Sequence, residues 1–284
     1  MNMILIADSG STKTHWCLLH HNATLRTVVT PGINPVLQDD ADIDSVLSEK
    51  LIPALGDLAA HVHSVWFYGA GVIPQQQPRM QRLLAAHFTH ADIHVATDLL
   101  GAARALFILE EGIACILGTG SNSGCYDGNE LVENVPPLGF ILGDEGSGAV
   151  MGKRFLGNLY KGLLPEALRD DFEQTMQLDM AEVIRRVYRS PMPNRFLASF
   201  APYIAAHLDC TPLHEMVVEH FRLFFQRNVA AYDRPDLPVG VVGSIAHHFR
   251  PALEEAAHAE GFSLKCIMQS PIEGLAEYHI KTNS

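Results

Sequence analysis

The sequence has 284 residues, of which 48% are hydrophobic and 18% charged, and a net charge of −12, with Asp plus Glu outnumbering Lys plus Arg 32 to 20. This composition excludes a disordered or fibrous chain, and the length favours two globular domains over one. The acidic balance argues against nucleic acid and anionic membranes as partners, because both require basic surface.

The first predicted element is a β-hairpin. The apolar run Met3–Ala7 stops at Asp8, five of the next six residues are Ser, Gly or Thr, and a second apolar run covers Trp16–Leu19. This order predicts two strands joined by a tight turn. Backbone N–H groups in such a turn suit phosphate oxygens, and a carboxylate at a strand end suits hydrated Mg²⁺. A surface hairpin rich in turn-forming residues is the alternative at this point.

The following segment alternates between predicted strands and helices. Pro35 keeps Asn34 out of the helical region, which predicts a loop there. Asp98 lies just after a predicted strand, and ligands of α/β sheets bind at the carboxyl ends of strands. The predicted strands are Thr24–Val29, Ser64–Tyr68 and Asp92–Ala96, and the predicted helices are Asp42–Leu58 (broken near Pro53), Pro78–Phe88 and Leu99–Leu109.

The pattern of the first hairpin returns in the middle of the chain. The apolar run Gly112–Leu117 is followed by a small-residue turn at Gly118–Gly124 and by a returning strand that starts at Cys125. Two copies of strand, Gly/Ser/Thr turn and strand predict a duplicated domain. The second copy therefore strengthens the phosphate interpretation of the first.

The remaining sequence predicts a mainly helical region and the rest of a second sheet. A glycine-rich loop, Leu138–Gly148, carries Asp144 and Glu145, and apolar residues then recur three and four apart from Ala149 to Asn228. The predicted helices are Phe172–Tyr188, Phe196–Leu208, Leu213–Tyr232, Ile245–Glu260 (broken at Pro251) and Pro271–His279, and the predicted strands are Pro238–Val242 and Phe262–Met268.

Two nucleotide-binding motifs are incomplete. Gly148–Lys153 resembles the end of a P-loop, but the first glycine is missing and Arg154 replaces the required Ser or Thr. Gly118–Gly120 lacks the third glycine of the dinucleotide-binding motif. Among the 15 histidines, His87, His90 and His94 are separated by the predicted change from helix to strand near Asp92, and His247 and His248 point apart on a predicted helix, which argues against a structural zinc site.

Four loops lie at predicted strand ends: Asp8–Thr14, Thr97-Asp98, Gly118–Ser121 and Gly243-Ser244. Phosphoryl transfer needs two backbone cradles for phosphate, a carboxylate for the metal, a second carboxylate that accepts a proton, and a place for the nucleoside. The four loops supply these parts in order and favour a phosphotransferase.

These loops resemble those of the sugar-kinase branch of the actin-like ATPase superfamily, and within it the N-acetylglucosamine kinase family. That family shares a sequence family with the ATPases that activate benzoyl-CoA reductase and 2-hydroxyacyl-CoA dehydratase. The resemblance covers essentially the whole chain and implies an α/β fold of two ribonuclease H-like (actin-like ATPase) domains flanking an inter-domain cleft. The motifs that carry it are Asp8–Thr14, Thr97-Asp98 with Gly101–Arg104, Gly118–Asn122, Leu142–Gly148 and Val241–Ser244.

The resemblance implies ATP and Mg²⁺ as cofactors and a role for each loop. Asp8 would position Mg²⁺ through water, and Asp98 would be the general base for a sugar hydroxyl. The residues implied in ATP binding are Ser9, Gly10, Ser11, Thr12, Lys13, Gly118, Thr119, Gly120, Ser121, Gly243 and Ser244. The residues implied in sugar binding are Asn34, Asp98, Thr119 and Asp144.

Simpler interpretations of three of these residues stay open. Asp98 could instead cap the helix from Leu99, Asp144 could be a turn former, and Asn34 could fill a loop.

The reaction that the resemblance implies is phosphorylation of the 6-hydroxyl of an amino sugar. N-acetylglucosamine is the first expected substrate, with N-acetylmuramic acid and glucosamine as alternatives.

The cysteines favour a kinase over an activating ATPase. The activators hold an iron–sulphur cluster between two subunits, each of which contributes a pair of cysteines. Here the cysteines lie in or beside apolar runs and form no C-x-x-C pair: Cys17, Cys115, Cys125, Cys210 and Cys266. They predict reduced thiols. A nucleotide-binding protein without catalysis is a third possibility.

The predicted organisation is an N-terminal domain at 1–109, a C-terminal domain with a helical insertion at 110–270, and a final helix at 271–284 that packs back on the first domain. No apolar run approaches the roughly 20 residues of a membrane-spanning helix. Because no signal peptide is recognised either, we expect a cytoplasmic protein. The resemblance implies a homodimer.

Overall fold

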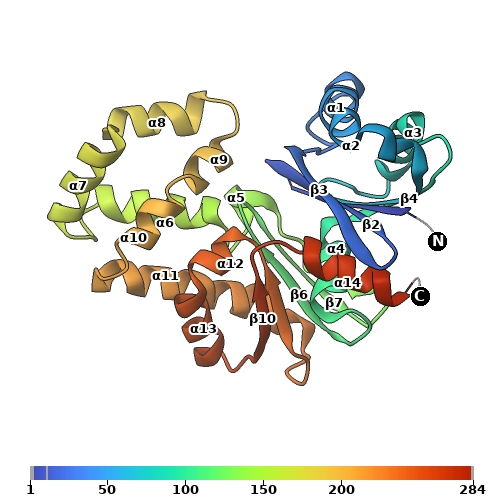
Figure 1. The fold of residues 1–284 in the computed structure, drawn as a ribbon. Helices are drawn as coiled ribbons and strands as arrows, with labels where there is room; N and C mark the ends of the chain where they lie inside the picture. Colours follow the sequence, from blue (N-terminus) through green and yellow to red (C-terminus); the bar gives the residue numbers. More distant parts are fainter. Residues whose placement is uncertain (1–2, 11, 283–284) are drawn as a thin grey trace. The chain divides into compact units, whose positions relative to one another are not determined.

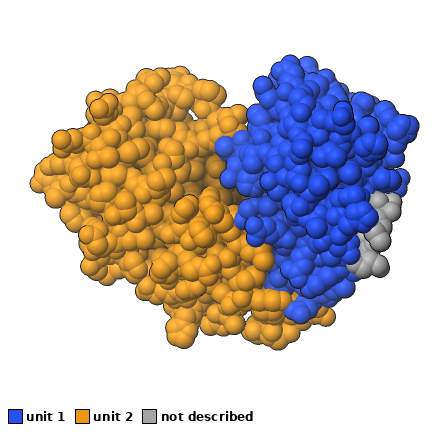
Figure 2. Space-filling view, in the orientation of Figure 1, with its two compact units in different colours: residues 1–110, 128–131, 270–284 blue, residues 111–127, 132–269 orange. Residues whose placement is uncertain are grey.

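The computed structural model describes residues 3–10 and 12–282, and the chain forms two compact units. Unit 1 comprises residues 1–110, 128–131 and 270–284, and unit 2 comprises residues 111–127 and 132–269 (Figure 2). Each unit is built around its own five-stranded sheet. Unit 1 is therefore assembled from segments far apart in the sequence.

The sheet of unit 1 has the strand order β3-β2-β1-β4-β5. β1 pairs antiparallel with β2 and parallel with β4, and β4 pairs parallel with β5. The carboxyl ends of β1, β4 and β5 consequently meet at one edge of the sheet. The strands are β1 (Met3–Ser9), β2 (Lys13–His20), β3 (Ala23–Pro31), β4 (Val62–Gly69) and β5 (Asp92–Thr97).

Different helices cover the two faces of this sheet (Figure 1). Alternating side chains of β1 pack against them. Leu5 and Ala7 join a core with α1, η1, α2 and α3, whereas Ile6 packs with α4 and α14 on the other face. A Cβ at Gly274 of α14 would lie 2.6 Å from the Ala105 carbonyl oxygen, so only glycine allows this approach. The helices are α1 (Asp40–Val46), the π-helical turn η1 (Leu47–Leu51), α2 (Ile52–Leu55), the 3₁₀-helix η2 (Gly56–His61), α3 (Gln77–His87), α4 (Asp98–Phe107) and α14 (Ile272–Thr282).

The sheet of unit 2 repeats the pairing seen around β1. Its order is β10-β9-β6-β7-β8, with β6 antiparallel to β7 and parallel to β9, and β9 parallel to β10. Both units thus contain a hairpin whose first strand lies beside a parallel strand, and the predicted repetition of the hairpin is confirmed. The strands are β6 (Gly112–Leu117), β7 (Ser121–Tyr126), β8 (Leu131–Glu133), β9 (Val239–Val242) and β10 (Leu264–Met268).

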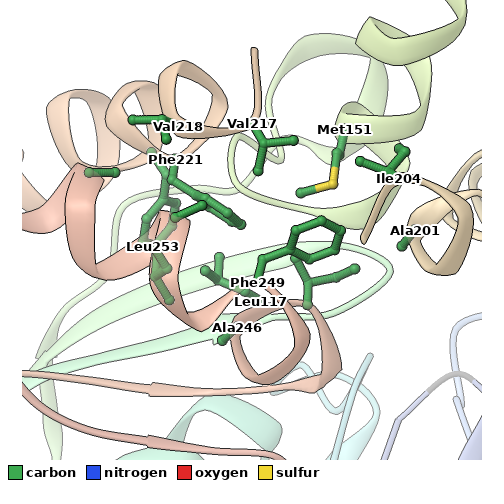
Figure 3. Close-up of a cluster of buried hydrophobic side chains, with 14 of the residues drawn as sticks. Leu117, Met151, Ala201, Ile204, Val217, Val218, Phe221, Ala246, Phe249 and Leu253 are labelled. Atoms are coloured by element: carbon green, nitrogen blue, oxygen red, sulfur yellow. The ribbon is translucent and has the colours of Figure 1, made fainter. Parts of the chain in front are cut away.

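Helices of unit 2 pack against this sheet through a large apolar core. Figure 3 shows Leu117 of β6, Met151 of α6, Phe221 of α11 and Phe249 converging in this core. The helices are α5 (Gly139–Leu142), α6 (Gly148–Tyr160), α7 (Glu166–Met176), α8 (Met180–Arg189), α9 (Pro193–Ala198), α10 (Ala201–Ala206), α11 (Thr211–Phe224), η3 (Phe225–Val229), η4 (Ala230–Tyr232), α12 (Ser244–His248) and α13 (Arg250–Ala259). None of the helices within residues 3–10 and 12–282 is long and apolar enough to cross a membrane.

Three predicted segments differ from the structure. Phe196–Leu208, predicted as one helix, is divided between α9 and α10. Ser121–Gly124, predicted as turn, is the first part of β7, because pairing with β6 overrides the low strand propensity of Ser, Asn and Gly. Phe172–Tyr188, predicted as one helix, is divided between α7 and α8. Gln177 adopts a left-handed conformation (φ 51°), and the Asp179 carboxylate then accepts a hydrogen bond from Glu182 N, which starts a new helix.

Candidate active site

Ser9 holds the end of the first hairpin from the inside. Its side chain is fully buried, and its hydroxyl lies 2.7 Å from the Thr14 hydroxyl. The same Oγ donates to the Ile33 carbonyl (2.9 Å) and accepts from Ile33 N (3.1 Å). These bonds connect the hairpin to the loop after β3. The Ser9 hydroxyl therefore faces the protein interior, and a nucleotide contact by this residue would not come from its side chain.

The turn between β1 and β2 is exposed. Gly10 N donates to the Lys13 carbonyl (3.0 Å), and the Thr12 carbonyl accepts from Gly32 N (3.1 Å). Gly10, Thr12 and Lys13 are all exposed at this turn, as a phosphate cradle requires. Ser11, also predicted to bind ATP, lies outside the described residues.

Asp8 and Asp98 lie at the same edge of the unit 1 sheet. Asp8 is next to the end of β1, and Asp98 follows β5, whose last residue pairs with Gly69 of β4. Burial, and next in size the nearby Asp98 carboxylate, raise the Asp8 pKa to about 7. Since Asp98 raises the cost of ionising Asp8, a divalent cation bound here would stabilise the charged form of Asp8.

Thr97, rather than Asp98, caps helix α4. The Thr97 hydroxyl accepts a hydrogen bond from Leu100 N (3.1 Å) at the N-cap position. Asp98 is the first helical residue, and its Oδ1 accepts from Leu99 N (2.9 Å). Burial raises the Asp98 pKa to about 6. Because another residue performs the capping, the role of Asp98 as a helix cap is not needed to explain its position.

Asn34 belongs to the same part of unit 1. Its Oδ1 accepts from Val36 N (3.0 Å), and its backbone N–H donates to Gln38 Oε1 (2.7 Å). A Cβ at Gly71, which has φ +76°, would overlap the Asn34 amide. The loop after β4 thus packs directly against Asn34. Ala70 N in that loop also donates to the Ser9 carbonyl (2.8 Å), so Asn34 lies beside the first hairpin.

In unit 2, Asp144 lies over the turn of the second hairpin. Its Oδ2 is 3.2 Å from the position that a Cβ on Gly120 would take, and the carboxylate accepts a hydrogen bond from Ser121 N. Burial is the main cause that raises the Asp144 pKa to about 6. Gly148 N and Ala149 N of α6 donate to carbonyls of the same turn, at 2.8 and 3.1 Å. The turn and the loop that carries Asp144 therefore form one assembly.

A cavity of about 490 Å³ adjoins this assembly. Gly243, with φ +129°, brings the start of α12 so near β6 that a Cβ would overlap the Leu117 carbonyl. The cavity is lined by Thr119, Ala198, Ser199, Ala201, Pro202, Ala205, Ser244, Ile245 and His248. We call it the α9–α12 cavity. Its mostly apolar wall and its volume are typical of small-molecule sites.

The predicted site residues fall into two groups. Unit 1 contains Asp8, the first turn, Asn34 and Asp98, and unit 2 contains the second turn, Asp144, Gly243 and Ser244. The sequence analysis missed the cavity wall formed by α9 and α10, since alanines in a helical region give no functional signal. It also missed His15 and Ser270, which lie near Asp8. Among the described residues, no group of three or more His, Cys, Asp or Glu could hold a metal ion.

Comparison with solved structures identifies the family. A protein from Porphyromonas gingivalis, named "Putative N-acetylglucosamine Kinase", is 49% identical to the chain, with a TM-score of 0.97. The match covers 99% of this chain and 100% of that one. The chain belongs to the N-acetylglucosamine kinase family. The family predicted from the sequence motifs is therefore confirmed.

More distant structures agree with the fold of the N-acetylglucosamine kinase family. A protein of the same name from Chromobacterium violaceum is 19% identical, with a TM-score of 0.76 over 98% of this chain and 99% of that one. Component A of (R)-2-hydroxyglutaryl-CoA dehydratase from Acidaminococcus fermentans is 12% identical, with a TM-score of 0.50 over 99% and 97% of the two chains. No family model and no curated protein matches the chain. The two mixed sheets and these similarities confirm the predicted actin-like ATPase fold, which is that of sugar kinases.

Proposed function

We propose that the protein is an ATP-dependent kinase that phosphorylates the 6-hydroxyl of an amino sugar, with N-acetylglucosamine as the first substrate to test. The observation that carries the proposal is the environment of Asp98. Its carboxylate lies at the carboxyl end of β5, is close to Asp8, and has a pKa raised to about 6 by burial. A carboxylate with a pKa near neutrality is suited to accept a proton from a sugar hydroxyl.

The residues present fit ATP and Mg²⁺. Asp8 offers hard carboxylate oxygens next to a second carboxylate, which is the donor chemistry that Mg²⁺ prefers. The exposed residues Gly10, Thr12 and Lys13 offer a turn to phosphate, and the α9–α12 cavity could receive the nucleoside beside Ser244. When bound, the magnesium nucleotide supplies the phosphoryl group and neutralises its charge.

The residues of the chain would then bind and orient the sugar and receive its proton. Asp98 would accept the proton of the attacking hydroxyl, so that the oxygen becomes a better nucleophile, an effect of roughly 10²–10⁴-fold in rate. Asn34, Asp144 and Thr119 would hydrogen-bond the sugar hydroxyls or the acetamido group. The raised pKa of Asp144 reflects a partly buried carboxylate, the kind that gains by accepting hydroxyl hydrogen bonds.

The alternative of an activating ATPase finds no support in the cysteines. Cys17, Cys115 and Cys125 are buried within strands, and Cys266 lies in β10. Burial raises the pKa of the Cys115 thiol, which disfavours the thiolate that binds a metal cluster. The similarity to component A of the dehydratase concerns the fold alone. We therefore favour a kinase over an activating ATPase.

The decisive variant is Asp98→Asn. It keeps the shape of the side chain and the hydrogen bond from Leu99 N but cannot accept a proton at neutral pH. We expect ATP binding to remain and kcat with N-acetylglucosamine to fall about 10²–10⁴-fold. The measurement is a coupled ADP-release assay combined with mass spectrometry of the sugar product.

Asp92→Asn is the matched control, because Asp92 is an exposed carboxylate at the other end of the same strand. It should leave kcat unchanged. Near-normal turnover in Asp98→Asn would refute the assignment of the base.

The same assay with N-acetylmuramic acid, glucosamine and glucose ranks the substrates. Light scattering tests the homodimer, which stays a prediction from the resemblance.

A further inference from the structure

His15 lies beside Asp8 on the unit 1 sheet. In the antiparallel pairing of β1 with β2, Asp8 is directly opposite His15. Directly opposed residues in such a pair project from the same face of the sheet, so the carboxylate and the imidazole are neighbours. Both side chains are partly buried. His15 is therefore placed to act on the carboxylate to which the proposed function gives the metal.

Ser270 connects these two side chains. Its Oγ lies 3.0 Å from His15 Nδ1, and its hydroxyl forms a hydrogen bond with the Asp8 carboxylate. When Asp8 is ionised, as a metal ligand must be, its carboxylate only accepts hydrogen bonds, so the Ser270 hydroxyl donates to Asp8 and its oxygen accepts from Nδ1–H of His15. In that state the ionised Asp8 carboxylate determines the direction of both hydrogen bonds. The Ser270 hydroxyl consequently holds the Asp8 carboxylate in one orientation, and His15 in turn orients that hydroxyl.

Ser270 also lies close in sequence to the segment of unit 2 that contacts Gly243, beside the α9–α12 cavity. The Met268 carbonyl at the end of β10 accepts a hydrogen bond from Gly243 N (2.9 Å). Only Gln269 separates Met268 from Ser270, where the chain passes from unit 2 to unit 1. This short covalent connection links the loop beside the α9–α12 cavity to the residue that holds Asp8.

We infer that Ser270 and His15 are positioning residues that orient the Asp8 carboxylate toward the hydrated Mg²⁺ of the bound nucleotide. The inference rests on the metal role of Asp8 in the proposed function. Neither residue needs to contact the nucleotide. Ser270 supplies one hydrogen bond to the carboxylate, and His15 fixes the direction of that bond, which leaves the remaining lone pairs of Asp8 for the water ligands of the ion.

Binding of ATP with and without Mg²⁺, measured by titration calorimetry, tests the inference without any sugar. In Ser270→Ala we expect the affinity for ATP in Mg²⁺ to fall about tenfold or more, as for loss of a hydrogen bond to a charged group. The affinity for ATP in excess chelator should stay at the wild-type value. Ser270→Thr keeps a hydroxyl and should restore Mg²⁺-dependent binding.

His15 is tested by two substitutions. His15→Ala removes the Nδ1 donor and should weaken Mg²⁺-dependent ATP binding several-fold, whereas His15→Asn keeps an N–H donor at a similar position and should recover most of it. The control is Ser48→Ala, because the Ser48 hydroxyl also donates one hydrogen bond within unit 1, to the Asp44 carbonyl (2.8 Å). Circular dichroism and thermal melting establish that each variant is folded.

Equal Mg²⁺-dependent affinity in Ser270→Ala and wild type would overturn the inference. So would a loss of the same size with and without Mg²⁺, which indicates a merely structural role. If the wild-type protein binds ATP independently of Mg²⁺, both this inference and the role of Asp8 are wrong. Mg²⁺-dependent binding without sugar phosphorylation would refute the kinase while leaving the positioning role supported.

Discussion

At the scale of single residues, the acid–base chemistry depends on where carboxylates are buried. Asp98 and Asp144 each have a pKa raised to about 6, in both cases mainly by burial. Their environments differ: Asp98 begins a helix beside Asp8, whereas Asp144 accepts from the backbone of the second hairpin. This difference favours Asp98 as the base and Asp144 as a hydrogen-bonding partner of the sugar.

The raised pKa of Asp98 predicts the pH dependence of the reaction. A general base acts in its deprotonated form, so kcat/KM for the sugar should rise with pH through about 6 and become constant above about 7. At pH 5 it should be about tenfold below the plateau. Rates should be measured at saturating Mg²⁺, which keeps Asp8 ionised. A profile that is flat from pH 5 to 8 would contradict the assignment.

At the scale of elements, the periodicity of apolar residues located the hairpins and most helices. It failed where contacts with distant segments override the local preference of the residues. The apolar runs of β1 and β6 were evident because both strands are buried on two faces. Ser121–Gly124 gave the wrong prediction because those residues are typical of turns, and only β6 as a partner makes them a strand. The division at Gln177 was missed since a non-glycine left-handed residue has no strong sequence signal.

The close contact between α12 and β6 makes Gly243 a critical position. In Gly243→Ala the new Cβ would overlap the Leu117 carbonyl, a backbone atom that cannot move without opening the hairpin. We expect a lower melting temperature and weaker ATP binding, because the α9–α12 cavity is displaced. Thermal melting and calorimetry check both effects.

Gly261→Ala provides the matched control for that variant. Gly261 also has a positive φ (+80°), but no atom lies within 4 Å of the position of a new Cβ. Gly261→Ala should therefore lower the free energy of unfolding by only about 1–2 kcal/mol, the cost of placing alanine at a positive φ, and should leave ATP binding unchanged. If the two variants behave alike, the overlap with Leu117 is not the cause.

At the scale of the whole molecule, the sequence predicted the fold and the candidate residues near strand ends, but not their partners. Asp8 and Asp98 were found because each follows an apolar run or a predicted strand. The capping bond of Thr97 is local, but Thr and Asp are both common N-caps, so the sequence did not decide between Thr97 and Asp98. The contact of Asp144 with the second hairpin and the pair His15–Ser270 depend on distances between segments apart in sequence. Local patterns contain no information about those distances.

The buried carboxylates also predict how the stability of the whole protein depends on pH. The pKa values of Asp8, Asp98 and Asp144, about 7, 6 and 6, lie above the ordinary value of 3.8. The folded state therefore binds protons more tightly than the unfolded state. The resulting loss of stability is absent below pH about 4, grows up to about 7, and is complete above it.

Asp8→Asn removes the contribution of Asp8 to this loss of stability, because an amide does not ionise. We expect its melting temperature to exceed that of the wild type by at least about 2 °C at pH 8 without Mg²⁺, and the gain to vanish at pH 4. Asp92→Asn, a change at an exposed carboxylate, should show no such difference. A melting temperature of Asp8→Asn below wild type at pH 8 would contradict the prediction.

The return of α14 to unit 1 has a consequence for synthesis of the protein. Ile6, Cys17 and Tyr68 pack against Leu275 and Ala276, which leave the ribosome long after the strands of the same sheet. Domains tend to fold as they emerge from the ribosome. Unit 2 is translated before α14, so this face of the unit 1 sheet stays exposed to solvent during that time. Nascent chains arrested before Ile272 should accordingly bind chaperones through that face.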